Sequence, residues 1–161
     1  MDTVFTSSFA PLPVEVKGVP SGGGKEVFDI KIAGYRRTWT SLPKTVKHVI
    51  HIRDNPLTFQ DTFDCVQRVI AERTQPAGPA CASARKGSLR YDTAVATAKL
   101  LRSPRYQYAD LSKFFCDATL CYPVIGGARV FKDAFGHLTT AYSRTLGPYL
   151  RREVRRLMKS W

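Results

Sequence analysis

The hydrophobic pattern of this chain changes period at Asn55-Pro56, and this change constrains the fold more than any other feature. Before it, apolar and polar residues alternate over 26–39 and 45–53, which is typical of β-strands. After it, apolar side chains recur at helical spacing, beginning with a helix expected over 58–74. Strands followed by helices predict an α+β fold, with N-terminal antiparallel β strands and a helical C-terminal half.

The remaining elements complete this organisation. Short extended pieces are expected at 4–9 and 14–16, and helices at 91–102, 108–119 and 130–142, with Gly147-Pro148 separating the last of them from a terminal helix. A stretch rich in proline, glycine, alanine and serine suggests a hinge at 75–87. We therefore expect one domain, 1–161, with a β-rich part over 1–55 and a basic helical part over 56–161.

The terminal segment, 147–161, has the pattern of an amphipathic helix. Its apolar stripe consists of Leu150, Val154, Leu157, Met158 and Trp161. Its basic side chains are Arg151, Arg152, Arg155, Arg156 and Lys159. Such a helix either packs on its own protein with its charges outward or lies on an anionic surface. In the second case, Met158 and Trp161 are the residues expected to insert into a membrane.

Positive charge is concentrated in the second half of the chain. The 161 residues carry 25 Lys and Arg against 13 Asp and Glu, for a net charge of +12, and residues 76–161 account for +10 of it. A one-sided excess predicts a positive face that attracts RNA or acidic lipid. Beside the terminal helix, a second candidate patch for nucleic-acid or lipid binding contains Arg85, Lys86, Arg90, Arg102 and Arg105.

The four cysteines do not have the spacing of a disulfide framework, so we expect reduced, buried thiols. Cys116, Cys121 and His137 could supply three zinc ligands, but no second ligand pair accompanies them, and neither a metal nor a cofactor is expected. No signal peptide or apolar membrane span is evident. These features predict a cytoplasmic or peripheral membrane protein.

Motifs of known catalytic chemistry are missing from the sequence. The glycine-rich run at 19–26 lacks the first glycine and the final Ser or Thr of a phosphate-binding loop. His48 and His51 lie on opposite faces of the expected strand, and His48 is the one expected to face the core. We therefore predict a protein that is not an enzyme, while a small enzyme using Cys116 or His137 remains an alternative.

Two segments have family resemblances. Residues 27–46, VFDIKIAGYRRTWTSLPKTV, resemble the central strand of rhabdovirus matrix proteins, where an F-x-(I/V)-K-(I/M) strand leads through a basic, aromatic turn toward a helix. The matching residues are Phe28, Ile30, Lys31, Ile32, Arg37 and Trp39. Residues 66–79 and 90–101 are similar to rod-shaped plant-virus coat proteins. Both resemblances imply a viral structural protein.

The leading functional hypothesis is a non-enzymatic, self-associating structural protein of the viral matrix or nucleocapsid type. It would bind RNA, an acidic membrane surface, or both, would form part of a virion, and would have no small-molecule substrate. The alternative hypothesis is an RNA-binding regulator or silencing suppressor that recognises duplex shape or an acidic protein.

Overall fold

The computed structural model describes residues 2–10, 24–73 and 75–159, and the chain forms two compact units. We call the first the sheet unit; it comprises Met1–Asp54, Tyr91–Asp110 and Glu153–Trp161. We call the second the disulfide unit; it comprises Asn55–Arg90 and Leu111–Arg152. The expected extended piece at 14–16, most of the glycine-rich run and Trp161 lie outside the described residues.

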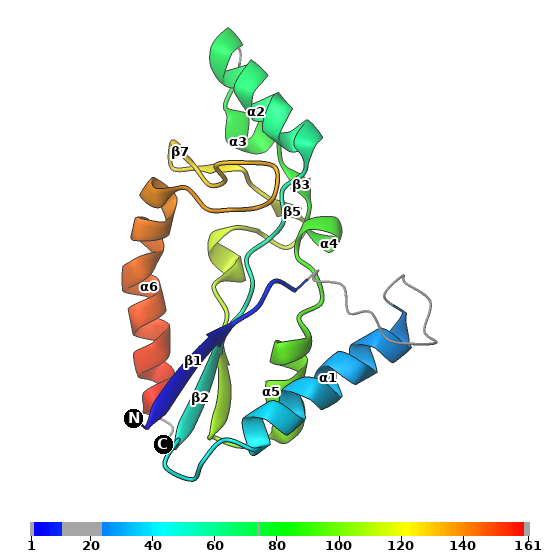
Figure 1. The fold of residues 1–161 in the computed structure, drawn as a ribbon. Helices are drawn as coiled ribbons and strands as arrows, with labels where there is room; N and C mark the ends of the chain where they lie inside the picture. Colours follow the sequence, from blue (N-terminus) through cyan, green and yellow to red (C-terminus); the bar gives the residue numbers. More distant parts are fainter. Residues whose placement is uncertain (1, 11–23, 74, 160–161) are drawn as a thin grey trace. The chain divides into compact units, whose positions relative to one another are not determined.

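The sheet unit contains a three-stranded parallel sheet. Its strands are β1 (Thr3–Ser7), β2 (His48–Ile52) and β4 (Tyr106–Ala109), in the order β1-β2-β4 (Figure 1). Val49 and Ile50 of the central strand are completely buried, as expected where a parallel strand has neighbours on both sides. Strands that alternate with helices make this an α/β fold. The predicted α+β fold with antiparallel N-terminal strands is therefore wrong.

Helix α1 (Lys25–Thr40) occupies the segment where the alternation over 26–39 predicts β structure. The strand expectation rests on Phe28, Ile30 and Ile32, which alternate with polar residues. The set Phe28, Ile32, Tyr35 and Trp39 is instead spaced at i, i+4, i+7 and i+11 and so lines one side of a helix. Trp39 is 2% exposed, and its ring lies 5.7 Å from that of Tyr35. Packing of this stripe decides between two patterns that the sequence leaves equally open.

Helix α5 (Thr93–Leu101) confirms the helix expected over 91–102. Asp92 caps it, since its carboxylate accepts hydrogen bonds from the backbone N–H groups of Ala94 (2.9 Å) and Val95 (3.1 Å). The helix packs beside α1 and next to the sheet (Figure 1).

The helix expected over 108–119 is wrong. Strand β4 covers its beginning, and only the short 3₁₀ turn η1 (Ser112–Phe114) is helical there.

The disulfide unit consists of short elements around two apolar clusters. They are α2 (Gln60–Glu72), α3 (Ala77–Ala80), β3 (Ser83–Ala84), α4 (Arg85–Ser88), η1, β5 (Leu120–Cys121), β6 (Val124–Ile125), β7 (Ala128–Arg129) and the first part of α6 (Thr140–Met158). Helix α2 confirms the helix expected over 58–74. Gly78 of α3 has no room for a side chain, because a Cβ there would lie 2.5 Å from the Val124 carbonyl oxygen.

Helix α6 corrects two expectations about the end of the chain. It begins at Thr140 rather than 130, and the Thr139 Oγ1 accepts the Tyr142 N–H at 3.1 Å as an N-terminal cap. It also continues through Gly147-Pro148, where a break was expected. No helix within the described residues is long and apolar enough to cross a membrane.

All four cysteines are paired, so the prediction of reduced thiols is wrong. Cys65 on α2 is bonded to Cys81 after α3, and Cys116 is bonded to Cys121. Both bridges lie within the disulfide unit.

Removing the Cys65–Cys81 bridge should destabilise the chain. A double Cys65→Ser, Cys81→Ser variant is expected to lose about 3 kcal/mol, because this bridge closes a loop of 16 residues in the unfolded chain. Urea denaturation monitored by circular dichroism measures the loss. The control is Ser143→Ala, which changes an exposed side chain on α6. Equal free energies of unfolding for the two variants would show that the Cys65–Cys81 bridge does not stabilise the chain.

Ionisation of Tyr142 is expected to destabilise the disulfide unit at alkaline pH. Burial raises the pKa of Tyr142 to about 12, with a smaller contribution from Tyr149, and its hydroxyl donates to the Phe114 carbonyl. Because this pKa lies above the unfolded value near 10, the stabilisation is complete below pH 10 and is lost as the pH rises toward 12. We expect up to about 3 kcal/mol of pH-dependent loss, which Tyr142→Phe removes. Urea midpoints at pH 9 and 11.5 measure it; the same pH dependence in the variant would refute it.

Candidate active site

The loop that precedes α6 is held closed at its base. Phe131 and Leu138 form an antiparallel bridge, and the Lys132 N–H donates to the His137 carbonyl at 2.9 Å. Phe131 belongs to a buried apolar cluster of the disulfide unit, and Leu138 packs against it. The short excursion between Phe131 and Leu138 is therefore anchored in the core at both ends.

Asp133 organises the interior of this loop. Its Oδ1 accepts the backbone N–H groups of Phe135 (3.0 Å) and His137 (3.3 Å), while its Oδ2 lies 2.8 Å from the His137 Nδ1. An ionised carboxylate only accepts hydrogen bonds, so the proton of the neutral imidazole resides on Nδ1. Asp133 thereby fixes both the turn and the tautomer, and the second ring nitrogen, Nε2, keeps its lone pair.

The pKa of Asp133 keeps this carboxylate charged at neutral pH. Partial burial by itself raises that pKa, but hydrogen bonds from the His137 ring and from the backbone N–H groups of Phe135 and His137 outweigh it. The net effect is a pKa below the ordinary aspartate value.

The imidazole is open to solvent. The His137 side chain is 65% exposed and that of Asp133 is 31% exposed. Within the described part of the chain, the His137 Nε2 makes no hydrogen bond. An exposed, unprotonated ring nitrogen whose partner nitrogen is held by a carboxylate can take a proton from an attacking hydroxyl group. We call Asp133 and His137 the Asp–His pair.

The chain matches a known family over nearly its whole length. Residues 2–152 match the model of the SGNH domain (fused to AT3 domains). The chain belongs to the SGNH domain family. This is a family of hydrolases and esterases. The parallel sheet of the chain, with helices alternating between its strands, is consistent with the fold of this family. No curated protein and no solved structure matches the chain.

Membership in the SGNH family overturns the functional hypotheses drawn from charge. A non-enzymatic viral protein that coats RNA or a membrane and has no small-molecule substrate is wrong, and so is the RNA-binding alternative, because SGNH domains are hydrolases that act on acylated substrates. The rhabdovirus resemblance fails structurally as well, since residues 27–46 form most of α1 and the turn after it rather than a strand.

The structure divides the predicted basic patch between the two units. Arg85, Lys86 and Arg90 belong to the disulfide unit, and Arg102 and Arg105 to the sheet unit. The Arg85 guanidinium donates to the Asp117 carbonyl, and that of Arg105 donates to the carbonyls of Leu42 and Pro43. Two of the five cations therefore support the backbone of their own unit. Anion binding by this set stays a prediction.

The cations of the terminal helix are all exposed; they are Arg151, Arg152, Arg155, Arg156 and Lys159. Arg156 forms a bidentate pair with Glu153, at 2.7 and 3.0 Å. Of the apolar stripe, Leu157 is buried while Met158 is 46% exposed. Binding by these side chains also stays a prediction.

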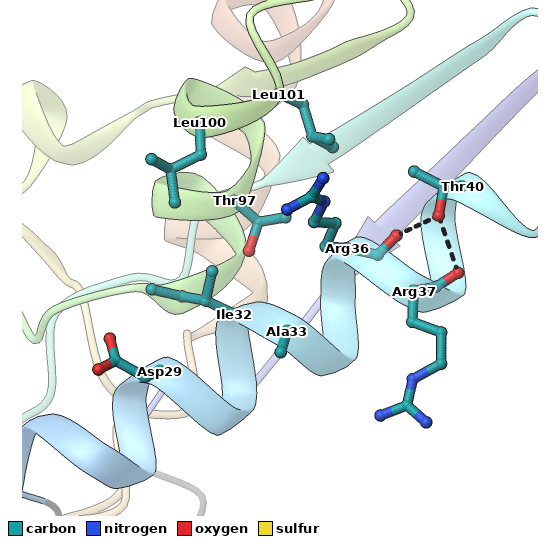
Figure 2. A pocket seen from close by; sticks show the side chains of 9 residues that line it. All are labelled: Asp29, Ile32, Ala33, Arg36, Arg37, Thr40, Thr97, Leu100 and Leu101. Atoms are coloured by element: carbon teal, nitrogen blue, oxygen red, sulfur yellow. Dashed lines mark hydrogen bonds between the residues drawn. The ribbon is translucent and has the colours of Figure 1, made fainter.

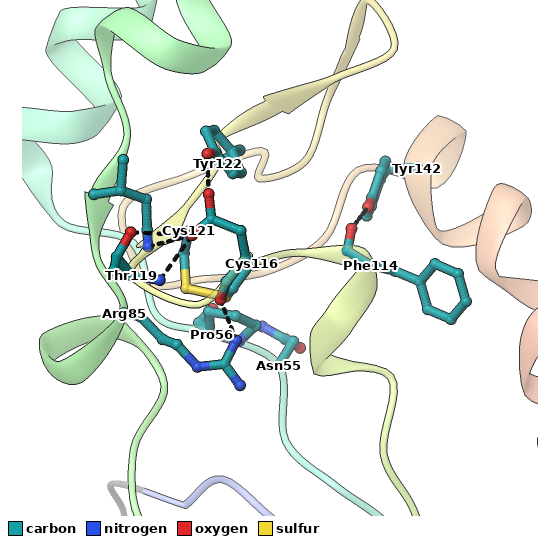
Figure 3. The surroundings of a disulfide bond; sticks show 11 residues. Asn55, Pro56, Arg85, Phe114, Cys116, Thr119, Cys121, Tyr122 and Tyr142 are labelled. Atoms are coloured by element: carbon teal, nitrogen blue, oxygen red, sulfur yellow. Dashed lines mark hydrogen bonds between the residues drawn. A yellow bond between two sulfur atoms is a disulfide. The ribbon is translucent and has the colours of Figure 1, made fainter.

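The cysteines once considered as zinc ligands are joined to each other (Figure 3). A disulfide has no thiolate to offer a metal, so the zinc alternative for Cys116, Cys121 and His137 is removed. No cluster of three possible metal ligands occurs among residues 2–10, 24–73 and 75–159. The loop closed by this bridge is organised by Asp117, which accepts the backbone N–H groups of Thr119 and Leu120.

His51, in the sheet unit, has hydrogen-bonding partners like those of a catalytic triad, but its side chain is not exposed to solvent. Its Nδ1 lies 3.1 Å from the Thr6 Oγ1, and its Nε2 lies 3.3 Å from the Asp92 Oδ2. Because His51 is completely buried, the hydrogen bonds from Thr6 through His51 to Asp92 join β1, β2 and the cap of α5, and do not contact a substrate. The expectation that His48 is the core histidine is wrong, since His48 is only half-buried.

A groove of about 620 Å³ between α1 and α5 is also a poor candidate for catalysis (Figure 2). The Arg36 guanidinium extends toward Thr97, while Arg37 points away from the groove. Its carboxylate, Asp29, is already paired with Lys25 at 2.6 Å. The groove has no histidine or cysteine in its lining, and so it lacks a proton acceptor comparable to His137.

The sequence indicates His137 only as a zinc ligand or as an alternative catalytic residue, and it gives no prediction for Asp133. The signal was the short spacing Asp133-x-x-x-His137 just before Thr139, the cap of α6. A helix stripe assigned over 130–142 obscured this spacing, because it treated the loop as part of a helix.

Proposed function

We propose that this chain acts on acyl esters of carbohydrates, either hydrolysing them or transferring their acyl groups. Its membership in a family of domains fused to acyltransferase-3 domains supports acyl chemistry. The observation that carries the proposal is the 2.8 Å contact between the His137 Nδ1 and the Asp133 Oδ2 on an exposed loop.

In the proposed reaction, the His137 Nε2 takes the proton of the attacking hydroxyl as its oxygen adds to the acyl carbonyl. That hydroxyl is a serine side chain or a water molecule. The Asp133 carboxylate stabilises the imidazolium that forms. When the carbonyl re-forms, the bond to the sugar oxygen breaks and the same proton passes from Nε2 to that oxygen. If water attacked, the acyl group leaves as a carboxylic acid. If a serine attacked, the acyl group is now its ester; water or an alcohol then adds to that ester by the same proton transfers, the bond to the serine oxygen breaks, and an acid or a new ester is released with the serine regenerated.

The two disulfides support a site of action outside the cytoplasm. Both bridges join short, loop-rich segments of the disulfide unit, and such bonds persist in oxidising compartments. An extracytoplasmic location also suits an enzyme that modifies surface or secreted carbohydrate.

The proposal is tested by incubating the full chain with an O-acetylated polysaccharide and with 4-nitrophenyl acetate. We expect acetate release from both, measured by NMR and by absorbance, at rates proportional to protein concentration. A fluorophosphonate probe, followed by peptide mapping, shows whether a serine forms the acyl intermediate. The proposed activity would be refuted if the chain is folded, as judged by circular dichroism, and releases acetate from neither of the two esters.

A further inference from the structure

The Asp–His loop rests on another segment of the disulfide unit. Gly136 is buried and has a φ of +87°, a conformation that favours glycine. A Cβ at Gly136 would lie 3.6 Å from the Leu57 Cα and 3.6 Å from the Pro56 carbonyl oxygen. The backbone just before His137 therefore lies directly against the segment at residues 55–58.

A single side chain joins this segment to the loop. The Asn55 Nδ2 donates to the Gly136 carbonyl at 3.0 Å and to the Pro56 carbonyl at 3.0 Å. Both amide protons are thus used, one on the loop and one on the supporting segment itself. Because Gly136 immediately precedes His137, the first of these bonds acts one residue from the imidazole.

The supporting segment is itself fixed. Pro56 is fully buried, Thr58 is 5% exposed, and the Leu57 N–H donates to the Ser88 carbonyl at 2.9 Å. Asn55 and Pro56 also lie in the surroundings of the Cys116–Cys121 disulfide (Figure 3). A hydrogen bond from a fixed segment can hold a loop in one position.

We propose that Asn55 is a positioning residue for the Asp–His pair. Its amide holds the Gly136 carbonyl, which sets the main chain of His137 and thereby the distance between the imidazole Nδ1 and the Asp133 carboxylate. Asn55 acts through His137 and takes no part in proton transfer. This inference rests on the proposed function for its catalytic consequence, but the geometry it describes is measurable without any activity.

The chemistry of the contact requires a donor at this position. Replacing Asn55 by aspartate puts a carboxylate oxygen against the Gly136 carbonyl, so an attraction becomes a repulsion. Replacing it by leucine removes the donor and leaves that carbonyl without its partner. Both substitutions preserve the approximate shape of the side chain.

The first test compares Asn55→Asp and Asn55→Leu with Gln60→Leu, a matched control that removes an exposed amide bonded to Asp64 on α2. Long-range ¹H–¹⁵N NMR reports the tautomer of each of the three histidines, and a His137→Gln spectrum assigns the signals. We expect the Nδ1–H tautomer at His137 in the wild type and in Gln60→Leu, and mixed tautomers in both Asn55 variants. Unchanged tautomers in the Asn55 variants would overturn the inference.

Kinetics give the second readout. With an active wild type, we expect kcat for 4-nitrophenyl acetate to fall about 10- to 100-fold in the Asn55 variants, with KM changed less than about 2-fold, as for a misplaced catalytic group. Equal kcat values would overturn the positioning role. If the NMR shift appears but the wild type cleaves no ester, the proposed function fails and the positioning of His137 stands.

A measurement on the wild type keeps the inference falsifiable if the variants do not fold. Because both Asn55 Nδ2 protons are hydrogen-bonded to backbone carbonyls, we expect them to exchange with solvent at least about 10-fold more slowly than the exposed Gln67 side-chain amide. Equal exchange rates would overturn it.

Discussion

Replacing His137 by glutamine is expected to lower kcat/KM for ester cleavage by about 10⁴-fold. In the structure, the Nδ1 of this imidazole is held by Asp133 and its Nε2 is open to solvent, so it is the group placed to accept the proton of the attacking hydroxyl. Glutamine keeps the polarity and much of the length of the side chain but cannot accept and return a proton near neutral pH. Initial rates on 4-nitrophenyl acetate and on an O-acetylated polysaccharide measure the loss.

Two substitutions serve as controls for His137→Gln. Lys132→Gln changes an exposed side chain on the same loop and leaves the Lys132 N–H bond to the His137 carbonyl intact. His48→Gln removes another histidine, from the sheet unit. Both should keep their activity within about 3-fold, because the hydrogen bonds of Asp133 described above come from the His137 ring and from backbone N–H groups, and from neither of these side chains. A His137→Gln enzyme as active as these controls would show that the base lies elsewhere.

Asp133→Asn is expected to lower kcat/KM by about 10³- to 10⁴-fold while leaving the loop folded. The amide oxygen can still accept the backbone N–H groups of Phe135 and His137, so the turn is preserved. The amide nitrogen, however, donates toward the His137 Nδ1, which moves the imidazole proton to Nε2. The nitrogen that should accept a proton then carries one.

The pH dependence of the wild type follows from the direction of the Asp133 pKa. Since hydrogen bonds hold that pKa below the ordinary value near 3.9, the carboxylate is charged above it and protonates only as the pH falls through the lowered value. Activity profiles between pH 5 and 9 should therefore show no step from Asp133.

The Asp133→Asn variant also decides whether Asp133 orients the His137 imidazole. If kcat/KM of this variant is less than about 10-fold below that of the wild type, the orienting role is refuted.

The sequence predicts the strongly periodic elements of this fold well. Strand β2 and helices α2 and α5 lie where their patterns place them. Helix α1 was predicted as β structure because Phe28, Ile30 and Ile32 alternate with polar residues, although Phe28, Ile32 and Trp39 also fit a helical stripe. Packing in the sheet unit, where Trp39 is buried, decides for the helix. The parallel order of the sheet follows from that helix, since a helical crossover joins parallel strands whereas a short turn joins antiparallel ones.

The candidate site was harder to predict because its hydrogen bonds are partly long-range. The bonds of Asp133 to His137 lie within five residues and could have been inferred from their spacing. The bond from Asn55 to Gly136 joins residues 81 positions apart, and no local pattern predicts it. Net charge misled the functional reasoning, because a positive surface describes the solvent-facing side chains and carries no information about a buried or loop-borne reaction site.

A double-mutant cycle on the Asp–His pair tests the central claim most directly. Wild type, Asp133→Asn, His137→Gln and the double variant are compared by kcat/KM for 4-nitrophenyl acetate, each checked for folding by circular dichroism. If the carboxylate acts only through the imidazole, the double variant will be no slower than His137→Gln alone. Losses that multiply in the double variant would show that the two side chains act independently, and would contradict a site built on their contact.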